Sequence, residues 1–473
     1  WGTTEYYMYN NNGTLAVAAR GEGELPESAQ FVCEYDEAAE YKFQFKTVDG
    51  AYYLAYPTLG GKSWLDNESE TGLEATSSKV TQFNVNKILA GGSVSATNEQ
   101  LLGLVQMDGY RGYDNGKYVA DAKNQPYEDV FGRKKIAVGG VALGAFEAKS
   151  VALTDAIGDT ASAFTYDGKH LETPYASVDF DECGYIASFM DKQSGRQLRR
   201  EGAAPLGTFY MGEDIPEYWD NWDVEYDQKF KMRPQTNLID RQVVSEGAVE
   251  FRIRSTYKIG NYSTIDVDAI FYADSPRVDF HAKVDWKDKH QLLKVSFDVD
   301  VLATKAKHEI QFGHIERPTT ENDSVETARF EVCNLKWTDV SESRFGVALL
   351  NDCKYGISVR GSDLRLSLHR GGTHPDPAGD FGVHEMTYSL LPHCGDFCVQ
   401  NVVCPAYELN APVIVAPGAL TAPLAAPVLV DADNVIVEAV KPAEDIEGAY
   451  VVRLYEAERA RTTTQLTFPA DVK

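Results

Sequence analysis

Alternation of apolar and polar residues, the pattern of half-buried strands, most restricts what this chain can fold into. It runs through stretches such as Val249–Ile259 (VEFRIRSTYKI), Arg277–Trp286 (RVDFHAKVDW) and Leu292–Val301 (LLKVSFDVDV). A period of two places successive side chains on opposite faces of a strand, whereas the helical period is almost absent from the chain. The strand lengths and turn spacings predict an all-β protein with a large antiparallel β-sandwich, or supersandwich, over residues 139–409.

Residues 1–138 contain an internal repeat built on tight turns. Three segments place Asn-Gly or Asp-Gly before an aromatic or aliphatic strand: Tyr6–Ala18, Phe45–Pro57 and Tyr110–Ala122. Each is followed by a second apolar segment, which begins at Gln30, Gln82 or Glu128. Asn-Gly and Asp-Gly favour hairpins because both turn positions take positive φ. The repeat predicts a β-trefoil-like module, in which each unit covers the apolar face of its neighbours. A lectin-like site and a spacer role both remain open for this module.

A proline-rich strip, Asn410–Pro427, separates the sandwich from a last β unit. That unit begins at Asn434 and places an acidic turn, Glu444–Gly448, between two apolar strands. We therefore predict a small terminal β-sandwich over residues 410–473. The prolines also argue against a transmembrane helix in the apolar stretch Ala411–Val430, since proline interrupts the hydrogen bonds of a helix.

Charge restricts the partners of the chain. The formal net charge is −26 and the pI is near 4.8. Nucleic-acid binders need a basic face and anionic membranes attract basic segments, so we expect neither partner. A neutral ligand such as a carbohydrate is compatible with an acidic surface.

The seven cysteines form no C-x-x-C pair and no dense disulfide pattern, which predicts buried thiols in a reducing compartment.

An aromatic and acidic loop, Asp214–Gln228 (DIPEYWDNWDVEYDQ), is the first candidate site. Trp219 and Trp222 can stack on a pyranose ring, while Asp220 and Asp223 can bind its hydroxyls. The alternative is that one of the two tryptophans belongs to the hydrophobic core.

A polar segment is the second candidate site. Its histidines and carboxylates could hold zinc if the hairpin folded back on itself, and they are His369, His374, Asp376, Asp380 and His384. Their spacing matches no required metal pattern, and the alternative is a polar loop with solvated or paired charges. The acidic residues of both segments are also crowded enough to include a glycosidase pair, which needs a separation of about 5–10 Å. Signature motifs of serine hydrolases, zinc proteases and nucleotide-binding loops are absent.

Several segments carry a family resemblance. They include His308–Thr319 (HEIQFGHIERPT), Phe345–Gly356 (FGVALLNDCKYG) and Leu364–His393, with Asp214–Glu225 upstream and Val440–Ala457 downstream. Together these segments resemble the C-terminal β region of glycoside hydrolase family 38, the α-mannosidases, over about residues 140–470.

The resemblance implies hydrolysis of α-mannosides by a zinc ion, an aspartate nucleophile and an acid/base carboxylate. In the family these groups lie in the parts that precede the β region, and none of their motifs occurs in this chain. We therefore expect no catalytic residue, no metal ligand and no cofactor in the chain itself, with zinc in a catalytic domain outside it. The resemblance is to the cytoplasmic or vacuolar branch of the family rather than the Golgi branch, and with the cysteine pattern we expect a cytoplasmic location.

Loops of the β region close over the sugar site in this family. By this resemblance, the residues expected to bind substrate are Trp219, Asp220, Trp222, Asp223, Arg370, His374, Asp376, Asp380 and His384. The leading hypothesis is the C-terminal β portion of an α-mannosidase, which shapes the sugar site without cleaving and has a catalytic α-mannosidase domain or chain as its partner. Two alternatives remain open: a free-standing carbohydrate-binding, lectin-like protein, and a structural piece whose trefoil recruits another protein.

Overall fold

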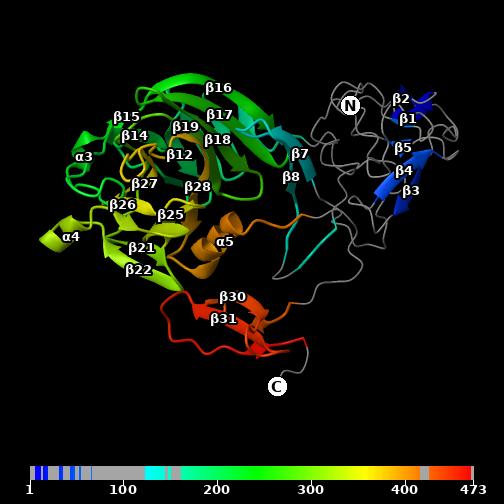
Figure 1. Ribbon diagram of the computed structural model, residues 1–473. Helices are drawn as coiled ribbons and strands as arrows, with labels where there is room; N and C mark the ends of the chain where they lie inside the picture. The colour runs from blue at the N-terminus through cyan, green and yellow to red at the C-terminus, as the bar shows by residue number, and fades with distance from the viewer. Residues whose placement is uncertain are drawn as a thin grey trace. The chain divides into compact units, whose positions relative to one another are not determined.

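The computed structural model describes residues 123–143, 147–150, 161–415 and 426–469, and the backbone of six strands between residues 6 and 66. Contacts between residues divide the chain into two units, Trp1–Asn115 and Gly116–Lys473 (Figure 1). The second unit contains both candidate sites.

The first unit contains strands of the predicted hairpins. β1 (Tyr6–Asn11) pairs antiparallel with β2 (Thr14–Ala19), so the first predicted hairpin is confirmed. A four-stranded sheet follows, made of β3 (Phe31–Tyr35), β4 (Phe43–Thr47), β5 (Tyr53–Leu54) and β6 (Leu65–Asp66). The repeat segments that begin at Gln82 and Tyr110 lie outside the described residues. The trefoil-like arrangement of residues 1–138 therefore stays a prediction.

The hairpin of β7 (Lys123–Glu128) and β8 (Lys134–Gly139) belongs to the second unit, although its sequence was grouped with the N-terminal repeat. The buried Gln125 amide explains this. Its Nε2 donates to Ser245 Oγ at 2.6 Å and to the Glu250 carbonyl at 2.8 Å. Its Oε1 accepts from the Val249 and Glu250 amides. A buried amide with every group paired ties this hairpin to the sandwich.

Three antiparallel sheets form the body of the second unit. A five-stranded sheet has the order β13-β12-β11-β10-β9, and its strands are β9 (Thr165–Tyr166), β10 (His170–Glu172), β11 (Ala176–Phe180), β12 (Ile186–Asp191) and β13 (Arg196–Gln197). A six-stranded sheet has the order β15-β14-β20-β27-β26-β23, with β14 (Thr208–Glu213), β15 (Arg233–Pro234), β20 (Gln291–Asp298), β23 (Val332–Cys333), β26 (Gly356–Arg360) and β27 (Asp363–Arg370).

The third sheet has nine strands in the order β16-β17-β18-β19-β28-β25-β24-β21-β22. They are β16 (Asn237–Glu246), β17 (Glu250–Ile259), β18 (Ser263–Tyr272), β19 (Val278–Trp286), β21 (Lys305–Ile310), β22 (Gly313–Pro318), β24 (Trp337–Ser341), β25 (Phe345–Asn351) and β28 (Gly382–Cys394). The predicted all-β class and antiparallel sandwich are confirmed for this unit.

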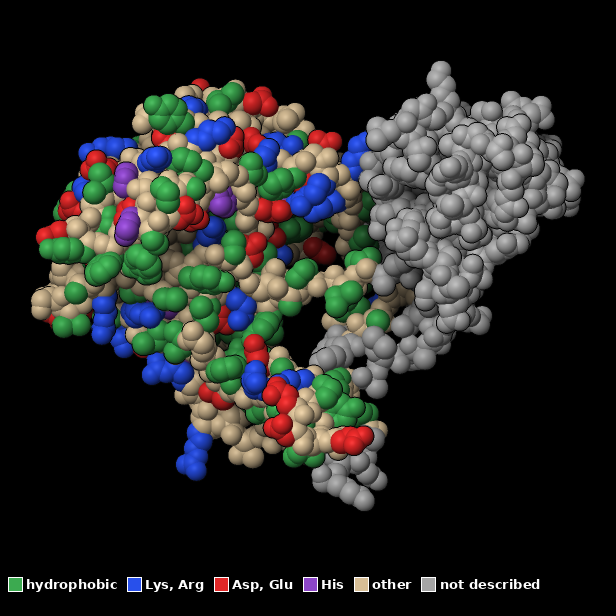
Figure 2. All heavy atoms as spheres, viewed as in Figure 1, with side chains coloured by type: hydrophobic (Ala, Val, Ile, Leu, Met, Phe, Trp, Pro, Cys, Tyr) green, Lys and Arg blue, Asp and Glu red, His purple; other side chains and the backbone are tan. Residues whose placement is uncertain are grey.

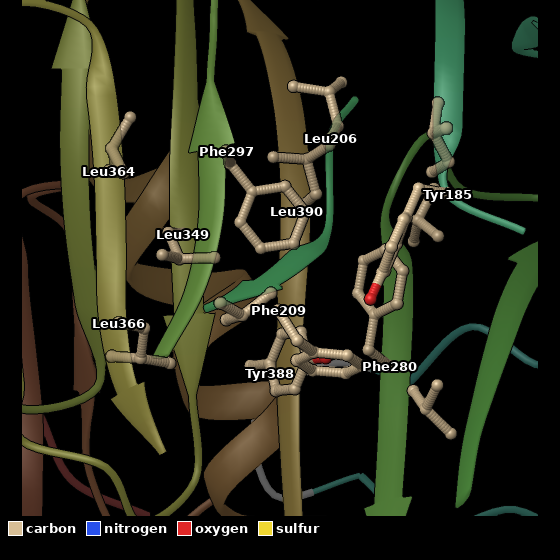
Figure 3. Close-up of a cluster of buried hydrophobic side chains, with 14 of the residues drawn as sticks. Tyr185, Leu206, Phe209, Phe280, Phe297, Leu349, Leu364, Leu366, Tyr388 and Leu390 are labelled. Atoms are coloured by element: carbon tan, nitrogen blue, oxygen red, sulfur yellow. The ribbon is translucent and has the colours of Figure 1, made fainter. Parts of the chain in front are cut away.

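The three sheets share one hydrophobic core. Figure 3 shows Phe297 and Leu366 of the six-stranded sheet beside Phe280, Tyr388 and Leu390 of the nine-stranded sheet. All five side chains are almost fully buried. Burial of side chains of this size contributes about 2–3 kcal/mol each, so the contact between the sheets is a main source of stability.

Strand β25 is buried on both faces, which explains its unbroken apolar sequence. Phe345, Val347 and Leu349 enter the main core, whereas Ala348 and Leu350 enter a second cluster on the opposite face. That cluster includes residues of a π-helical turn, η3 (Val399–Val403), and a helix, α5 (Cys404–Asn410). Neither was predicted from the sequence, because such short segments show no clear helical period. Two further short helices are α3 (Gln228–Lys231) and α4 (Ser324–Ala328).

The C-terminal strands continue from this second cluster. β30 (Val435–Pro442) and β31 (Tyr450–Glu456) form the predicted hairpin around the acidic turn, and β29 (Leu429–Val430) pairs with β32 (Leu466–Thr467). Ala457 is part of the second cluster, and its carbonyl lies 2.9 Å from His314 Nδ1. Within the described ranges, no helix is long and apolar enough to cross a membrane.

Candidate functional site

The two candidate segments meet because their strands border the same neighbour. β14 and β27 lie on either side of β20 in the six-stranded sheet. Glu213, the last residue of β14, pairs with Gln291, and Arg370, the last residue of β27, pairs with Leu292. Both strands therefore end at the same edge of the sheet, and the loops that follow them begin there. We call residues 214–227 and 371–381 the loop pair.

Arg370 connects the two halves of the loop pair. Its Nε donates to Asp214 Oδ2 at 2.6 Å, and its Nη2 donates to the carbonyls of Asp220 at 3.0 Å and Asp223 at 2.6 Å. The planar guanidinium suits such a set of acceptors because its donors have a fixed geometry. Asp214 is buried, and burial raises its carboxyl pKa even though the Arg370 charge opposes the shift. Arg370 thus holds the 214–223 backbone against the end of β27.

Asp220 forms the second connection. Its Oδ2 accepts from the backbone amides of Thr373 at 2.6 Å and His374 at 3.0 Å. Its Oδ1 lies 3.6 Å from His290 Nδ1. Burial alone would raise the pKa of Asp220, but the Thr373 amide, the His290 ring and the His374 amide together lower it. Asp220 therefore remains a carboxylate that fixes the 371–381 loop, and its binding of a ligand stays a prediction.

Trp219 and Trp222 project from the loop pair into solvent. Their exposed fractions are 67% and 68%, and their ring centroids lie 6.4 Å apart at an interplanar angle of 79°. Trp219 has a φ of 58°, a left-handed conformation that is uncommon for a bulky residue. Its carbonyl accepts from the amides of Trp222 at 2.7 Å and Asp223 at 3.0 Å, which closes a tight turn. The alternative that one of these tryptophans is a core residue is wrong.

The remaining predicted residues make contacts within their own hairpin. Asp376 Oδ1 accepts from the Ala378 amide at 2.9 Å, and His384 Nε2 lies 2.7 Å from the Asp380 carbonyl. The His384 ring packs against His369 with centroids 4.3 Å apart. His369 is buried, and burial, followed by the nearby His384, lowers its pKa to about 3. In the described part of the chain, no three of these or other His, Cys, Asp and Glu residues gather as metal ligands.

Residues that sequence reasoning missed complete the loop pair. Thr373 donates to Asp220, the His290 ring lies near it, and a Cβ on Gly372 would collide with the side-chain amide of Asn221. The Gly371-Gly372 pair after a strand was a usable signal, because adjacent glycines often mark a close approach of backbone to another group. Figure 2 shows histidine and acidic side chains beside apolar ones on the surface that carries β14, β27 and α3 in Figure 1.

Comparison with protein families agrees with this architecture. Residues 171–378 match the glycosyl hydrolases family 38 C-terminal domain, and residues 434–473 match the family 38 C-terminal beta sandwich domain. The chain carries a glycosyl hydrolase family 38 C-terminal region. Most of the loop pair falls inside the first match. The resemblance predicted for the β region is confirmed, while the trefoil-like module stays a prediction.

Relatives of the family 38 region are α-mannosidases. The chain is 39% identical over 292 residues to Alpha-mannosidase 2C1 of Homo sapiens, which covers 61% of this chain and 28% of that protein. It is 34% identical over 311 residues to Alpha-mannosidase G of Dictyostelium discoideum, with 63% and 28% coverage. The match thus spans just over a quarter of these relatives.

A solved structure shares the fold. An α-mannosidase from Enterococcus faecalis aligns with a TM-score of 0.56 over 74% of this chain and 44% of that chain. At 13% identity this similarity supports the architecture and carries no further conclusion about the site.

Proposed function

We propose that this chain forms the C-terminal β portion of an α-mannosidase that hydrolyses α-mannosides, and that the loop pair is one wall of its sugar site. The observation that carries this proposal is the pair of exposed tryptophans on a loop fixed by Arg370, within a family 38 region. Two large exposed aromatic side chains on one turn are unusual unless they contact a partner or ligand.

The geometry of the loop pair suits sugar binding. A tryptophan face covers the C–H face of a pyranose, and nearby carboxylates and amides bind its hydroxyls. Arg370 and Asp220 fix the backbone that carries Trp219 and Trp222 before any ligand arrives. A preorganised loop loses less conformational entropy on binding, so the same contacts yield a higher affinity.

We assign no bond-breaking step to the described residues. Among the described residues, no three His, Cys, Asp or Glu side chains gather as metal ligands. In this proposal zinc, the nucleophile and the acid/base carboxylate belong to a catalytic domain or chain that acts as the partner of this region. The described cysteines are free thiols, which supports a reducing location such as the cytoplasm.

Turnover of an aryl α-mannoside tests the proposal in two steps. The chain alone, with added zinc, should give no turnover, and activity that survives repurification would contradict the assignment. In the protein that joins this region to a family 38 catalytic portion, Trp222→Ala should raise KM roughly tenfold, the equivalent of about 1.4 kcal/mol, with kcat changed less. Tyr450→Ala is the matched control, because Tyr450 is 72% exposed on the C-terminal hairpin. Equal KM values for both variants would remove the loop pair from the sugar site.

A free-standing carbohydrate-binding protein is the second candidate function. Exposure of both Trp219 and Trp222 favours it, because the pair is accessible without a partner. Calorimetric titration of mannose into the chain alone separates the two hypotheses. Binding that disappears in Trp222→Ala supports the second function, whereas no binding by the chain alone favours the first.

A further inference from the structure

The 287–290 segment, which joins β19 to β20, is hydrogen-bonded to both halves of the loop pair. The His290 carbonyl accepts from the Asp214 amide at 2.8 Å, and the His290 amide donates to the Gly371 carbonyl at 2.7 Å. The Asp288 carbonyl also lies so close to Gly371 that a Cβ there would collide with it. A side chain cannot replace this glycine without a shift of the backbone, so the segment and the loop that begins at Gly371 pack directly against each other.

Asp288 connects this segment to a third loop, the turn between β17 and β18. The Asp288 side chain is buried. Its carboxylate accepts from the amides of Asn261 at 3.0 Å, Tyr262 at 3.1 Å and Ser263 at 2.9 Å, and from the Ser263 hydroxyl at 2.6 Å. Burial alone would raise the pKa of Asp288, but the Ser263 hydroxyl and the turn amides together lower it. Asp288 therefore stays a carboxylate that fixes the turn.

Tyr262 carries an exposed ring on this turn. Its exposed fraction is 68%, the same as that of Trp222. Because the Tyr262 amide binds the Asp288 carboxylate and the Asp288 carbonyl touches Gly371, the Tyr262 backbone lies within roughly 12 Å of Gly371. Exposed aromatic rings thus extend from the loop pair onto a third loop that is fixed to it.

We propose that the Tyr262 ring forms a second sugar-binding position beside the loop pair, and that Asp288 is its positioning residue. This second position depends on the proposed function, and it requires an α-mannoside with two or more sugar residues as the ligand. One sugar residue contacts Trp219 and Trp222, and a neighbouring one stacks on Tyr262, because a tyrosine ring can cover the C–H face of a pyranose while its hydroxyl stays hydrated. Asp288 is buried and does not touch the sugar. It holds the turn in place before the ligand arrives, which reduces the entropy lost on binding.

Kinetics in the protein that joins this region to a family 38 catalytic portion test the second position. With α-linked mannotriose as the substrate, Tyr262→Ala should raise KM roughly fivefold, the effect of one lost stacking contact. With an aryl α-mannoside, which has a single sugar residue, the same variant should change KM by less than about twofold. Tyr450→Ala is the matched control and should change neither KM, because Tyr450 is 72% exposed on the C-terminal hairpin. An unchanged KM for mannotriose in Tyr262→Ala would overturn the second position, and so would an equal rise for both substrates.

Trp222→Ala separates the second position from the proposed function. If Trp222→Ala raises KM for both substrates while Tyr262→Ala raises neither, the second position fails and the sugar wall of the loop pair stands. If Trp222→Ala raises KM for neither substrate, the proposed function fails and the second position fails with it.

A double variant tests the positioning role of Asp288. Asp288→Asn keeps the shape of the side chain but removes the charge that the turn amides bind, so KM for mannotriose should rise while KM for the aryl α-mannoside changes little. Asp288→Asn added to Tyr262→Ala should raise KM for mannotriose no further, because Asp288 acts through Tyr262. A further rise in the double variant would overturn the positioning role. If Asp288→Asn does not fold, Ser263→Ala replaces it, since this variant removes only the hydroxyl donor.

Discussion

Arg370 of β27 and Arg241 of β16 carry the same charged side chain in two different surroundings. Arg370 has a carboxylate at 2.6 Å and two further loop carbonyls within 3.0 Å, whereas Arg241 has an aromatic ring and two unpaired nitrogens. The donors of Arg370 are paired with acceptors of the 214–223 loop, so Arg370 connects the two loops. Arg241 has no acidic partner among the described residues and packs on the Phe180 ring instead. The distinction rests on which neighbours the fold supplies, since the side chain is the same.

Removal of the Arg370 charge should produce the largest effect. Arg370→Met leaves the buried Asp214 carboxylate without its partner, and loss of one member of a buried pair costs about 3 kcal/mol. Urea denaturation measures the loss. Lys169→Met, which removes an exposed partner of Glu182, is the control and should show no measurable change. A similarly small change in Arg370→Met would mean that Arg370 is no structural tie.

A methyl group at Gly372 should give the next effect. Gly372→Ala places the new Cβ against the end of the exposed Asn221 side chain, which must rotate away and lose its place in the loop pair, so we expect a destabilisation of about 1 kcal/mol. Asn221→Ala makes room, so the double variant should recover most of the loss in a double-mutant cycle. If the second substitution rescues nothing, the two halves of the loop pair do not meet at this point.

Asp220 should contribute a similar but pH-dependent amount. Asp220→Asn weakens the bonds from the Thr373 and His374 amides, at a cost of about 1 kcal/mol after solvent screening. Folding lowers the pKa of Asp220, so its stabilisation is fully present above its unfolded pKa of about 3.9 and is lost as pH falls through the lowered folded pKa. Stability curves of the two proteins should therefore differ at pH 7 and converge in acid. A constant difference across this range would exclude the charge of Asp220 as the cause.

Removal of the Arg241 charge should have the smallest effect. Arg241→Met replaces a half-buried cation that has no acidic partner among the described residues with an apolar side chain, and we expect a change within about 0.5 kcal/mol or a slight stabilisation. Urea denaturation provides the comparison with Arg370→Met. A loss as large as that of Arg370→Met would mean that the protein itself already compensates Arg241.

Local pattern predicted several long strands of the sandwich, two of them with nearly correct bounds. β17 spans Glu250–Ile259 and β19 spans Val278–Trp286, each within one residue of the alternating segment that predicted it. Alternation succeeds because one buried face requires an apolar residue at every second position. It failed for α5, whose seven residues cover about two turns and begin at Cys404-Pro405. The hairpin β7–β8 was assigned to the repeat because local sequence does not reveal the hydrogen bonds that Gln125 makes with Ser245 and Glu250, more than 100 residues away.

The residue types in the two loops also indicated where the loop pair lies, but they did not predict the hydrogen bonds within it. Trp219 and Asp220 were identified from their chemistry and Arg370 from the family resemblance, yet Asp214 and Arg370 lie 156 residues apart in the chain. Only the strand order β14-β20-β27 brings them together. Thr373 and His290 were missed for the same reason, since neither shows a local signal.

The sequence by itself determined the all-β class, the positions of several long strands and the acidic, tryptophan-bearing loop. The tertiary structure decided which charges have partners. Alternation specifies the face of a strand on which a side chain lies, but it does not specify which strand lies beside it. Arg370 meets Asp214 because their strands, β27 and β14, both border β20, whereas Arg241 of β16 contacts Phe180 of a different sheet.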